Sequence, residues 1–160
     1  MVNHDFSADI LIKTTSRGDE TLTKRYYVDA CIWRDFHENR EDKFRPLGEW
    51  AFNFLRMVRE TKSKVLYSDL IIKELSISYN EKEIKAMFKI IDEGGLLEKV
   101  ETTREQIKEV MRRKREGKFP FGDLLHAILA RDNQAIMVTR DKHFEEFDRI
   151  VEIQKPEDLI

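Results

Sequence analysis

The chain alternates short apolar runs with longer segments in which apolar residues return every three or four positions. The short runs are rich in aromatic and β-branched residues and end at polar or turn-forming residues, a pattern typical of buried strands. They predict strands at residues 24–28, 64–67, 96–100, 135–138 and 150–153. Each run is too short for an amphipathic helix, so a sheet is the expected centre of the fold.

The longer segments predict helices. An apolar stripe within residues 50–58 indicates the first one, and residues 34–46 are expected to precede it as a polar connection. A second helix begins at LIIKEL, where either Ser68 or Asp69 can supply the N-cap.

Three more helices are expected, over residues 84–91, 102–117 and 123–131. The first of these stops at Gly94-Gly95. The second is opened by an apparent capping box of Thr102 and Glu105 and ends at Gly117.

Strands separated by helices imply right-handed crossovers and a parallel sheet that lies between two helical layers. In such a fold, ligands bind beyond the carboxyl ends of the strands. Residues 25–160 are expected to form this domain, whereas residues 1–24 form an N-terminal extension. That extension could form a hairpin with a strand at residues 8–12, or it could be a mobile arm.

Composition narrows the class of protein. The 160 residues suit one domain, and 41% of them are hydrophobic, which is enough for a core. No run approaches the roughly 20 apolar residues of a membrane span, and the N-terminus makes a poor secretion signal, so no membrane association is expected. The single cysteine, Cys31, excludes an internal disulfide framework and fits the cytoplasm. With a net charge of −2, nucleic-acid binding would need a local basic patch.

Four acidic residues stand out from the 31 in the chain because of their positions. Asp29 and Asp141 follow predicted strands, although either could be a turn residue, and Asp29 a helix cap. Glu74 lies within about 60° of Leu70, Ile71, Ile77 and Ser78 on a helix, so its carboxylate is expected on an inward, largely apolar stripe. A buried carboxylate needs a cation, either a metal ion or an Arg or Lys partner.

Asp123 opens its predicted helix, where a capping role is a real alternative to a functional one. Asp132 falls on the opposite face and is interpreted as a surface acid. Four oxygen donors on separate segments suit Mg²⁺ or Mn²⁺ better than zinc. The chain has no phosphate-binding glycine loop and no GxSxG elbow, which disfavours nucleotide-dependent phosphotransfer and serine hydrolysis.

Four segments, in order, resemble the motifs of the PIN-domain nucleases, which include the toxin halves of VapBC toxin–antitoxin pairs. The resemblance covers about residues 25–153 and rests on the segments YYVDACIW, YSDLIIKEL, FGDLLHAILA and MVTRDKHF. It implies an α/β/α sandwich with a parallel, mostly five-stranded sheet. Family members often carry Thr-Asn or Ser-Asn after the first acid, where this chain has Ala30-Cys31.

The resemblance also implies a site and a function. Asp29, Glu74, Asp123 and Asp141 would hold one or two Mg²⁺ or Mn²⁺ ions, with Thr139 as the hydroxyl beside the fourth acid. The expected activity is metal-dependent endoribonuclease cleavage, as an RNA-cutting toxin or a related enzyme. The partners that this suggests are RNA, a small antitoxin protein and a second copy of the chain.

Basic residues near these motifs are candidates for binding the RNA backbone. For the basic residues between positions 111 and 118, the alternative to RNA binding is a solvated helix end, where positive charges interact favourably with the helix dipole. For His126, the alternative to substrate binding is a packed or hydrogen-bonded side chain with a structural role. The candidates are Arg34, Arg40, Arg112, Arg113, Arg115, His126 and Arg140.

Two other functions are compatible with part of this pattern. A catalytically silent PIN domain could serve as an RNA-binding or assembly module, but the intact acidic quartet argues against it. A phosphatase of the haloacid dehalogenase type also begins with an Asp after a strand. Its chemistry needs a second acid two residues later, where this chain has Cys31.

Overall fold

The computed structural model describes residues 23–117 and 119–160. The predicted hairpin or arm falls almost entirely outside these residues. The strands are β1 (Arg25–Val28), β2 (Lys64–Tyr67), β3 (Leu97–Lys99), β4 (Ile136–Val138) and β5 (Ile153–Gln154). The α-helices are α2 (Ala30–Glu38), α3 (Leu47–Thr61), α4 (Asp69–Leu75), α5 (Glu81–Asp92), α6 (Arg104–Glu116) and α7 (Phe121–Asp132). Two 3₁₀ helices complete the described elements, η1 (Lys142–Phe147) and η2 (Pro156–Asp158).

The five strands form one sheet in the order β3-β2-β1-β4-β5, and every neighbouring pair is parallel. The parallel sheet expected from the sequence is therefore confirmed. Strand β1 is central, and its Tyr26 lies opposite Val65 of β2 on one side and Ile136 of β4 on the other. The order reverses at β1, because the chain moves outward to β2 and β3 and then returns to β4 on the opposite side.

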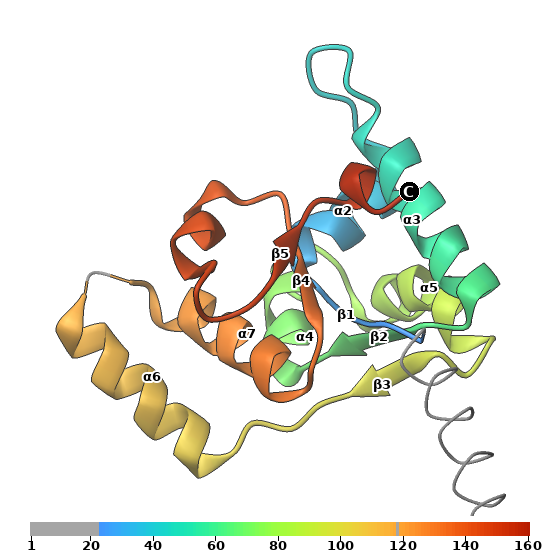
Figure 1. Cartoon of the computed structure of the whole chain (residues 1–160). Helices are drawn as coiled ribbons and strands as arrows, with labels where there is room; N and C mark the ends of the chain where they lie inside the picture. The colour runs from blue at the N-terminus through green and yellow to red at the C-terminus, as the bar shows by residue number, and fades with distance from the viewer. Residues whose placement is uncertain (1–22, 118) are drawn as a thin grey trace, which may run out of the picture.

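Helices cover both faces of the sheet (Figure 1). Right-handed crossovers put α3 and α5 on one face and α7 with η1 on the other, because the chain crosses the sheet in opposite directions before and after β3. Helix α6 packs on the outside of α7. Over the described residues, no helix combines the length and apolar character needed to cross a bilayer.

The core lies between the sheet and these two layers. Most residues of the three inner strands, β1, β2 and β4, are buried on both faces, as expected for a parallel sheet. Each fully buried Val, Leu or Phe side chain contributes roughly 1.5–3 kcal/mol of hydrophobic stabilisation. The side chains with no exposed surface include Tyr27, Val28, Val65, Leu66, Met137 and Val138 from the sheet, and Phe54, Leu55, Ile71, Leu75 and Ile128 from the helices.

The prediction that residues 34–46 form only a polar connection is wrong in its first part, because α2 runs through Glu38. Asp29 caps this helix, and its carboxylate accepts a hydrogen bond from Ala30 N at 2.8 Å. Ile32 and Trp33 bury one face of the helix completely. The charged and polar residues that follow Trp33 concealed this short amphipathic helix.

The capping box of α6 lies one residue later than predicted. Thr103 and Gln106 form it: Thr103 Oγ1 accepts from Gln106 N at 3.2 Å, and Gln106 Oε1 accepts from Thr103 N at 2.8 Å. The buried Gln106 side chain also donates from Nε2 to Asp132 at 3.0 Å. That contact between α6 and α7 explains why Gln106 occupies the capping position in place of Glu105.

Helices α6 and α7 are also joined by an ion pair. The Glu109 carboxylate accepts two hydrogen bonds from the Arg131 guanidinium, at 2.6 and 2.7 Å, and one from Arg113 at 2.7 Å. These hydrogen bonds, those from Arg131 above all, lower the pKa of Glu109 from its ordinary 4.5 to about 2. The carboxylate is thus held in its charged form by the contact.

Replacing Glu109 with glutamine tests this pair, since Glu109→Gln keeps the shape and removes the charge. We expect the free energy of unfolding at pH 7 to fall by about 1 kcal/mol in urea denaturation. Because the folded-state pKa is depressed, the stabilisation is fully present above pH 4.5 and is lost as the pH falls through about 2. A difference between the two proteins that stayed constant over that window would contradict the ion-pair explanation.

Helices α2 and α3 approach so closely that one position requires glycine. A Cβ on Gly48 would lie 2.4 Å from Asn39 Cα, while Gly48 N donates to Arg40 O at 2.9 Å. Asn39 ends α2 with a left-handed backbone (φ 46°), so it cannot easily move away.

Gly48→Ala is expected to lower the free energy of unfolding by about 1–3 kcal/mol, because the added methyl group overlaps backbone. Gly122→Ala is the matched control, since Gly122 also occupies the second position of a helix. Its Cβ would meet nothing nearer than Glu74 Oε1 at 3.9 Å. Chemical denaturation of both variants should show a loss only for Gly48→Ala, and equal losses would refute the steric explanation.

Candidate active site

All four predicted acids line one pocket at the carboxyl ends of β1 and β4. The sheet order reverses between these strands, which is where ligands bind in open parallel sheets. The pocket has a volume of about 290 Å³ and is lined by Asp29, Ala30, Cys31, Arg34, Glu74, Ile77, Asp123, His126, Asp141 and Phe144. A larger hollow of about 720 Å³ between α4, α5 and β3 contains none of the four acids.

Asp29 is the most buried of the four acids, with 7% of its surface exposed. One carboxylate oxygen accepts from Ala30 N, and the other accepts from Thr139 Oγ1 at 2.7 Å and from Cys31 Sγ at 3.3 Å. Burial raises the pKa of Asp29, while nearby His126 and the two side-chain hydrogen bonds oppose that rise. Asp29 does cap α2, but its second oxygen also belongs to the pocket.

Cys31 therefore supplies a polar contact at the place where the sequence departs from the family pattern. Its thiol lies within reach of both Asp29 and Thr139. Burial and the neighbouring Asp29 charge raise the pKa of Cys31, so the thiol stays protonated and donates.

Thr139 connects the first and fourth acids. Its hydroxyl donates to Asp29 and accepts a hydrogen bond from Asp141 N at 3.1 Å. The structure thus places Thr139 beside the acids, as the sequence predicted, and fixes the orientation of the Asp29 carboxylate.

Asp141 and Asp123 line the same pocket. Asp141 also caps η1 by accepting from His143 N at 2.9 Å, so the turn role considered for it is real. Asp123, in the first turn of α7, makes no capping hydrogen bond with any residue that the structure describes. Burial and, as the next largest cause, repulsion from Asp141 raise the pKa of Asp123. The negative charges in this cluster are therefore not fully balanced by nearby positive charges.

Glu74 is less enclosed than the sequence indicated. Its helix ends at Leu75, and Ile77, expected on the same inward stripe, is 83% exposed. The Glu74 side chain itself keeps about a third of its surface exposed (33%). Its carboxylate nevertheless points into the pocket and contacts His126 Nε2 at 2.8 Å.

His126 is buried, with 1% of its surface exposed, and both ring nitrogens are engaged. Nδ1 lies 2.7 Å from Tyr27 Oη, which lies 2.7 Å from Ser68 Oγ. The structure therefore agrees with the alternative of a hydrogen-bonded histidine. Tyr27 and Ser68 were not expected near the site, since only folding brings them to residue 126.

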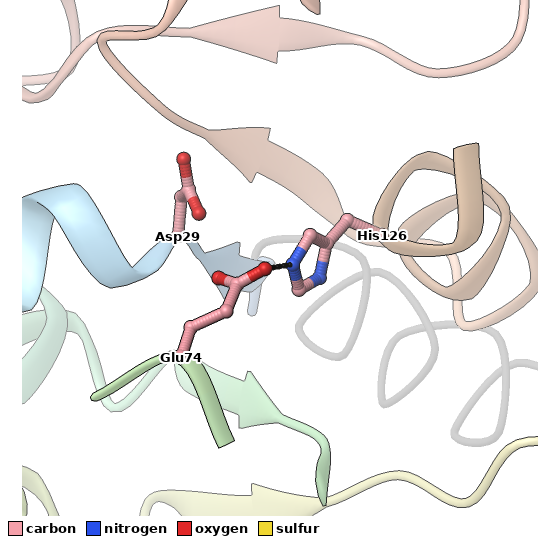
Figure 2. A group of neighbouring side chains, drawn as sticks. All are labelled: Asp29, Glu74 and His126. Atoms are coloured by element: carbon pink, nitrogen blue, oxygen red, sulfur yellow. Dashed lines mark hydrogen bonds and ion pairs between the residues drawn. The ribbon is translucent and has the colours of Figure 1, made fainter. Parts of the chain in front are cut away.

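Asp29, Glu74 and His126 each bring one possible metal-ligand atom to the site, and these three atoms lie within 4.8 Å of one another. Figure 2 shows the three side chains approaching from the β1–α2 junction, α4 and α7. Two carboxylates and an imidazole, with two more acids around the same pocket, form a donor set that fits a divalent cation.

The predicted basic residues are not all near this pocket. Arg34 lines it, and its buried Nε has no hydrogen-bond partner among the described residues. Arg40 follows the end of α2 and is paired with the buried Asp35 and with the exposed Glu38. None of the other predicted arginines lines the pocket, namely Arg112, Arg113, Arg115 and Arg140.

Arg140 has a different environment from the one expected for a phosphate contact. Its guanidinium donates to the buried Asp35 at 3.1 Å and to Glu157 at 2.7 and 2.9 Å. It also lies 5.8 Å from the centre of the Trp50 ring. Arg140 thereby ties the segment between β4 and η1 to α2 and η2.

A model of the PIN domain matches residues 26–150. The chain belongs to the PIN-domain family. Members of this family are generally nucleases. A sequence search of the curated proteins finds no match.

Solved structures share the fold of this PIN domain. One is VapBC2 from Rickettsia felis bound to a DNA fragment from their promoter, with 16% identity, a TM-score of 0.58, and coverage of 82% of this chain and 98% of that one. Another is PAE2754 from Pyrobaculum aerophilum, with 18% identity, a TM-score of 0.52, and coverage of 86% and 94%. At these identities the likeness concerns the fold alone, and it agrees with the α/β architecture.

Removing one of the pocket acids should stabilise the metal-free PIN domain. Asp123→Asn is expected to raise the free energy of unfolding by about 0.5–1 kcal/mol in EDTA, because solvent screens part of the repulsion. The raised folded-state pKa makes this gain largest at neutral pH and absent well below pH 3.8, where the acid is protonated in both states. Urea denaturation measures the gain, and the exposed Asp148→Asn serves as control; an equal gain there would contradict the repulsion.

Proposed function

We propose that the chain is a divalent-metal-dependent endoribonuclease. The observation that supports this most is the convergence of Asp29, Glu74, Asp123 and Asp141 on one pocket at the sheet's switch point. Four carboxylates in a single pocket repel one another and need a cation to balance them. A catalytically silent PIN domain has no need of such a cluster, so the silent alternative ranks second.

The four acids would hold Mg²⁺ or Mn²⁺, directly or through water. A bound ion of this kind lowers the pKa of a water molecule and neutralises charge that develops on the phosphate. Thr139 keeps the Asp29 carboxylate in one orientation through its hydrogen bond at 2.7 Å. A fixed carboxylate needs no rearrangement during the reaction, which is how preorganised sites gain rate.

Arg34 is the best candidate for a phosphate contact. It lines the pocket, and its Nε lacks a hydrogen-bond partner among the described residues. A guanidinium can donate two parallel hydrogen bonds to a phosphate. Arg34 would therefore orient the scissile phosphodiester beside the acids.

A more distant backbone contact is proposed for α6, which packs against the helix carrying Asp123. Near its C-terminal end, Arg113 is paired with Glu109 and Arg112 with Glu116, whereas no ion pair involves Arg115 within the described part of the chain. Cations on this helix would bind phosphates and make RNA binding weaker at high salt.

We also propose a protein partner. The fold neighbour from Rickettsia felis is a VapBC2 assembly, and this chain would likewise act as a toxin restrained by a small antitoxin. Phe52 on α3 is 44% exposed and stacks near Phe36, so this helical face offers apolar surface for such a partner or for a second copy of the chain.

Cleavage of single-stranded and structured RNA in Mg²⁺ or Mn²⁺, against EDTA, tests the activity. The Asp29→Asn/Asp123→Asn variant is expected to lose at least roughly a hundredfold in rate, because two donors of the metal site are removed. Gel analysis of end-labelled RNA measures the rate.

The matched control is Asp92→Asn/Asp148→Asn, which makes the same change of charge at exposed positions outside the pocket. It should cleave at the native rate. Full activity in a folded Asp29/Asp123 variant would refute the proposed site. Absence of metal-stimulated cleavage of any RNA by the native chain would favour the silent domain.

A further inference from the structure

We propose that His126 is itself a metal ligand through Nε2, together with Asp29 and Glu74, so that the site takes a first-row transition ion such as Mn²⁺ in preference to Mg²⁺. The inference rests on the metal site of the proposed function and deepens it. It replaces an all-oxygen site with a mixed site of two carboxylates and one imidazole.

The spacing of the donor atoms supports this set. His126 Nε2 lies 2.8 Å from Glu74 Oε1, and one donor atom from each of Asp29, Glu74 and His126 lies within 4.8 Å of the other two. Adjacent ligand atoms around a six-coordinate ion with bonds of about 2.1 Å are on the order of 3 Å apart. An ion could thus replace the hydrogen bond between His126 and Glu74 with little movement of either side chain.

The imidazole ring is held so that only Nε2 faces the acids. Nδ1 is engaged by Tyr27 Oη at 2.7 Å, and the ring packs at 5.5 Å from the Tyr27 ring and 6.4 Å from the Phe144 ring. A buried partner on the second ring nitrogen is the usual support of a metal-binding histidine, because it fixes the ring and the tautomer.

The hydroxyl chain behind the ring can serve both tautomers of a neutral imidazole. When Glu74 is ionised and no ion is bound, Nε2 carries the proton and donates to Glu74, while Tyr27 donates to Nδ1. With an ion on Nε2, that proton resides on Nδ1 and is donated to Tyr27, whose own hydrogen turns to Ser68 Oγ at 2.7 Å. The imidazole keeps one proton throughout, so no net charge is added.

A nitrogen ligand changes which ion is favoured. Mg²⁺ prefers oxygen donors and retains several waters, whereas imidazole binds first-row transition ions well. Asp123 and Asp141 line the same pocket and would complete the shell directly or through water. Selectivity for Mn²⁺ over Mg²⁺ is therefore expected to depend on residue 126.

Pulsed electron paramagnetic resonance on the full chain loaded with one equivalent of Mn²⁺ tests the proposal directly. A directly bound imidazole gives a nitrogen coupling on Mn²⁺, and labelling only the histidines with ¹⁵N changes that coupling in a known way. The native chain should show it, and His126→Gln should not. His4→Gln, His37→Gln and His143→Gln, which alter the other three histidines, should keep it.

Affinity provides a second measurement. Titration of free Mn²⁺, with Mg²⁺ as competitor, should show the preference for Mn²⁺ reduced roughly tenfold or more in His126→Gln. Tyr27→Phe, which keeps the ring and removes the hydroxyl, should weaken Mn²⁺ binding by roughly 10–100-fold.

A native chain that binds Mn²⁺ without any histidine nitrogen coupling would overturn the proposal. So would a coupling that His143→Gln removes and His126→Gln keeps, since the exposed His143 lies beside Asp141. If His126→Gln does not fold, retention of the coupling in the other three variants assigns it to His126. RNA cleavage without nitrogen coupling overturns only this inference, whereas nitrogen coupling without cleavage overturns only the proposed function.

Discussion

The parallel pairing of β1 with β4 is the constraint on which the site depends. Val28 lies opposite Val138, and Asp29 N donates to Val138 O at 2.9 Å. This register places Asp29 directly beside Thr139, although 110 residues separate them in the chain. A shift of one residue would turn the Asp29 carboxylate away from Thr139, because side chains alternate along a strand.

The segment after β4 is held from a second side by charge. Arg140 lies between Thr139 and Asp141 in sequence, but its side chain binds Asp35 of α2 and Glu157 of η2. Asp35 is almost fully buried, so breaking this pair would leave its charge in the protein interior with only Arg40, at 3.6 Å, to balance it. The pocket is thus positioned by main-chain pairing on one side and by ion pairs on the other.

Much of this arrangement could be predicted from the sequence. The strands, the parallel sheet and the positions of Asp29 and Asp141 followed from short apolar runs and the acids after them. Helix α2 was missed because its buried apolar residues, Ala30, Ile32 and Trp33, all lie near its start, and mostly charged or polar residues follow them. The sequence pattern also predicted a more buried Glu74 than the structure has, because it could not show that the helix ends at Leu75, one residue after Glu74. The contact of His126 with Tyr27 spans 99 residues and depends on tertiary packing that no local pattern records.

The two outer strands of the sheet limit how this chain can meet another. β5 has two residues, and β3 has three, of which Glu98 and Lys99 are charged and engaged in ion pairs. Such short, charged edges offer few unpaired main-chain groups to a foreign strand, which protects a protein against joining edge to edge. The described part of the sheet therefore favours little association through its edges, and assembly is left to the helical surfaces.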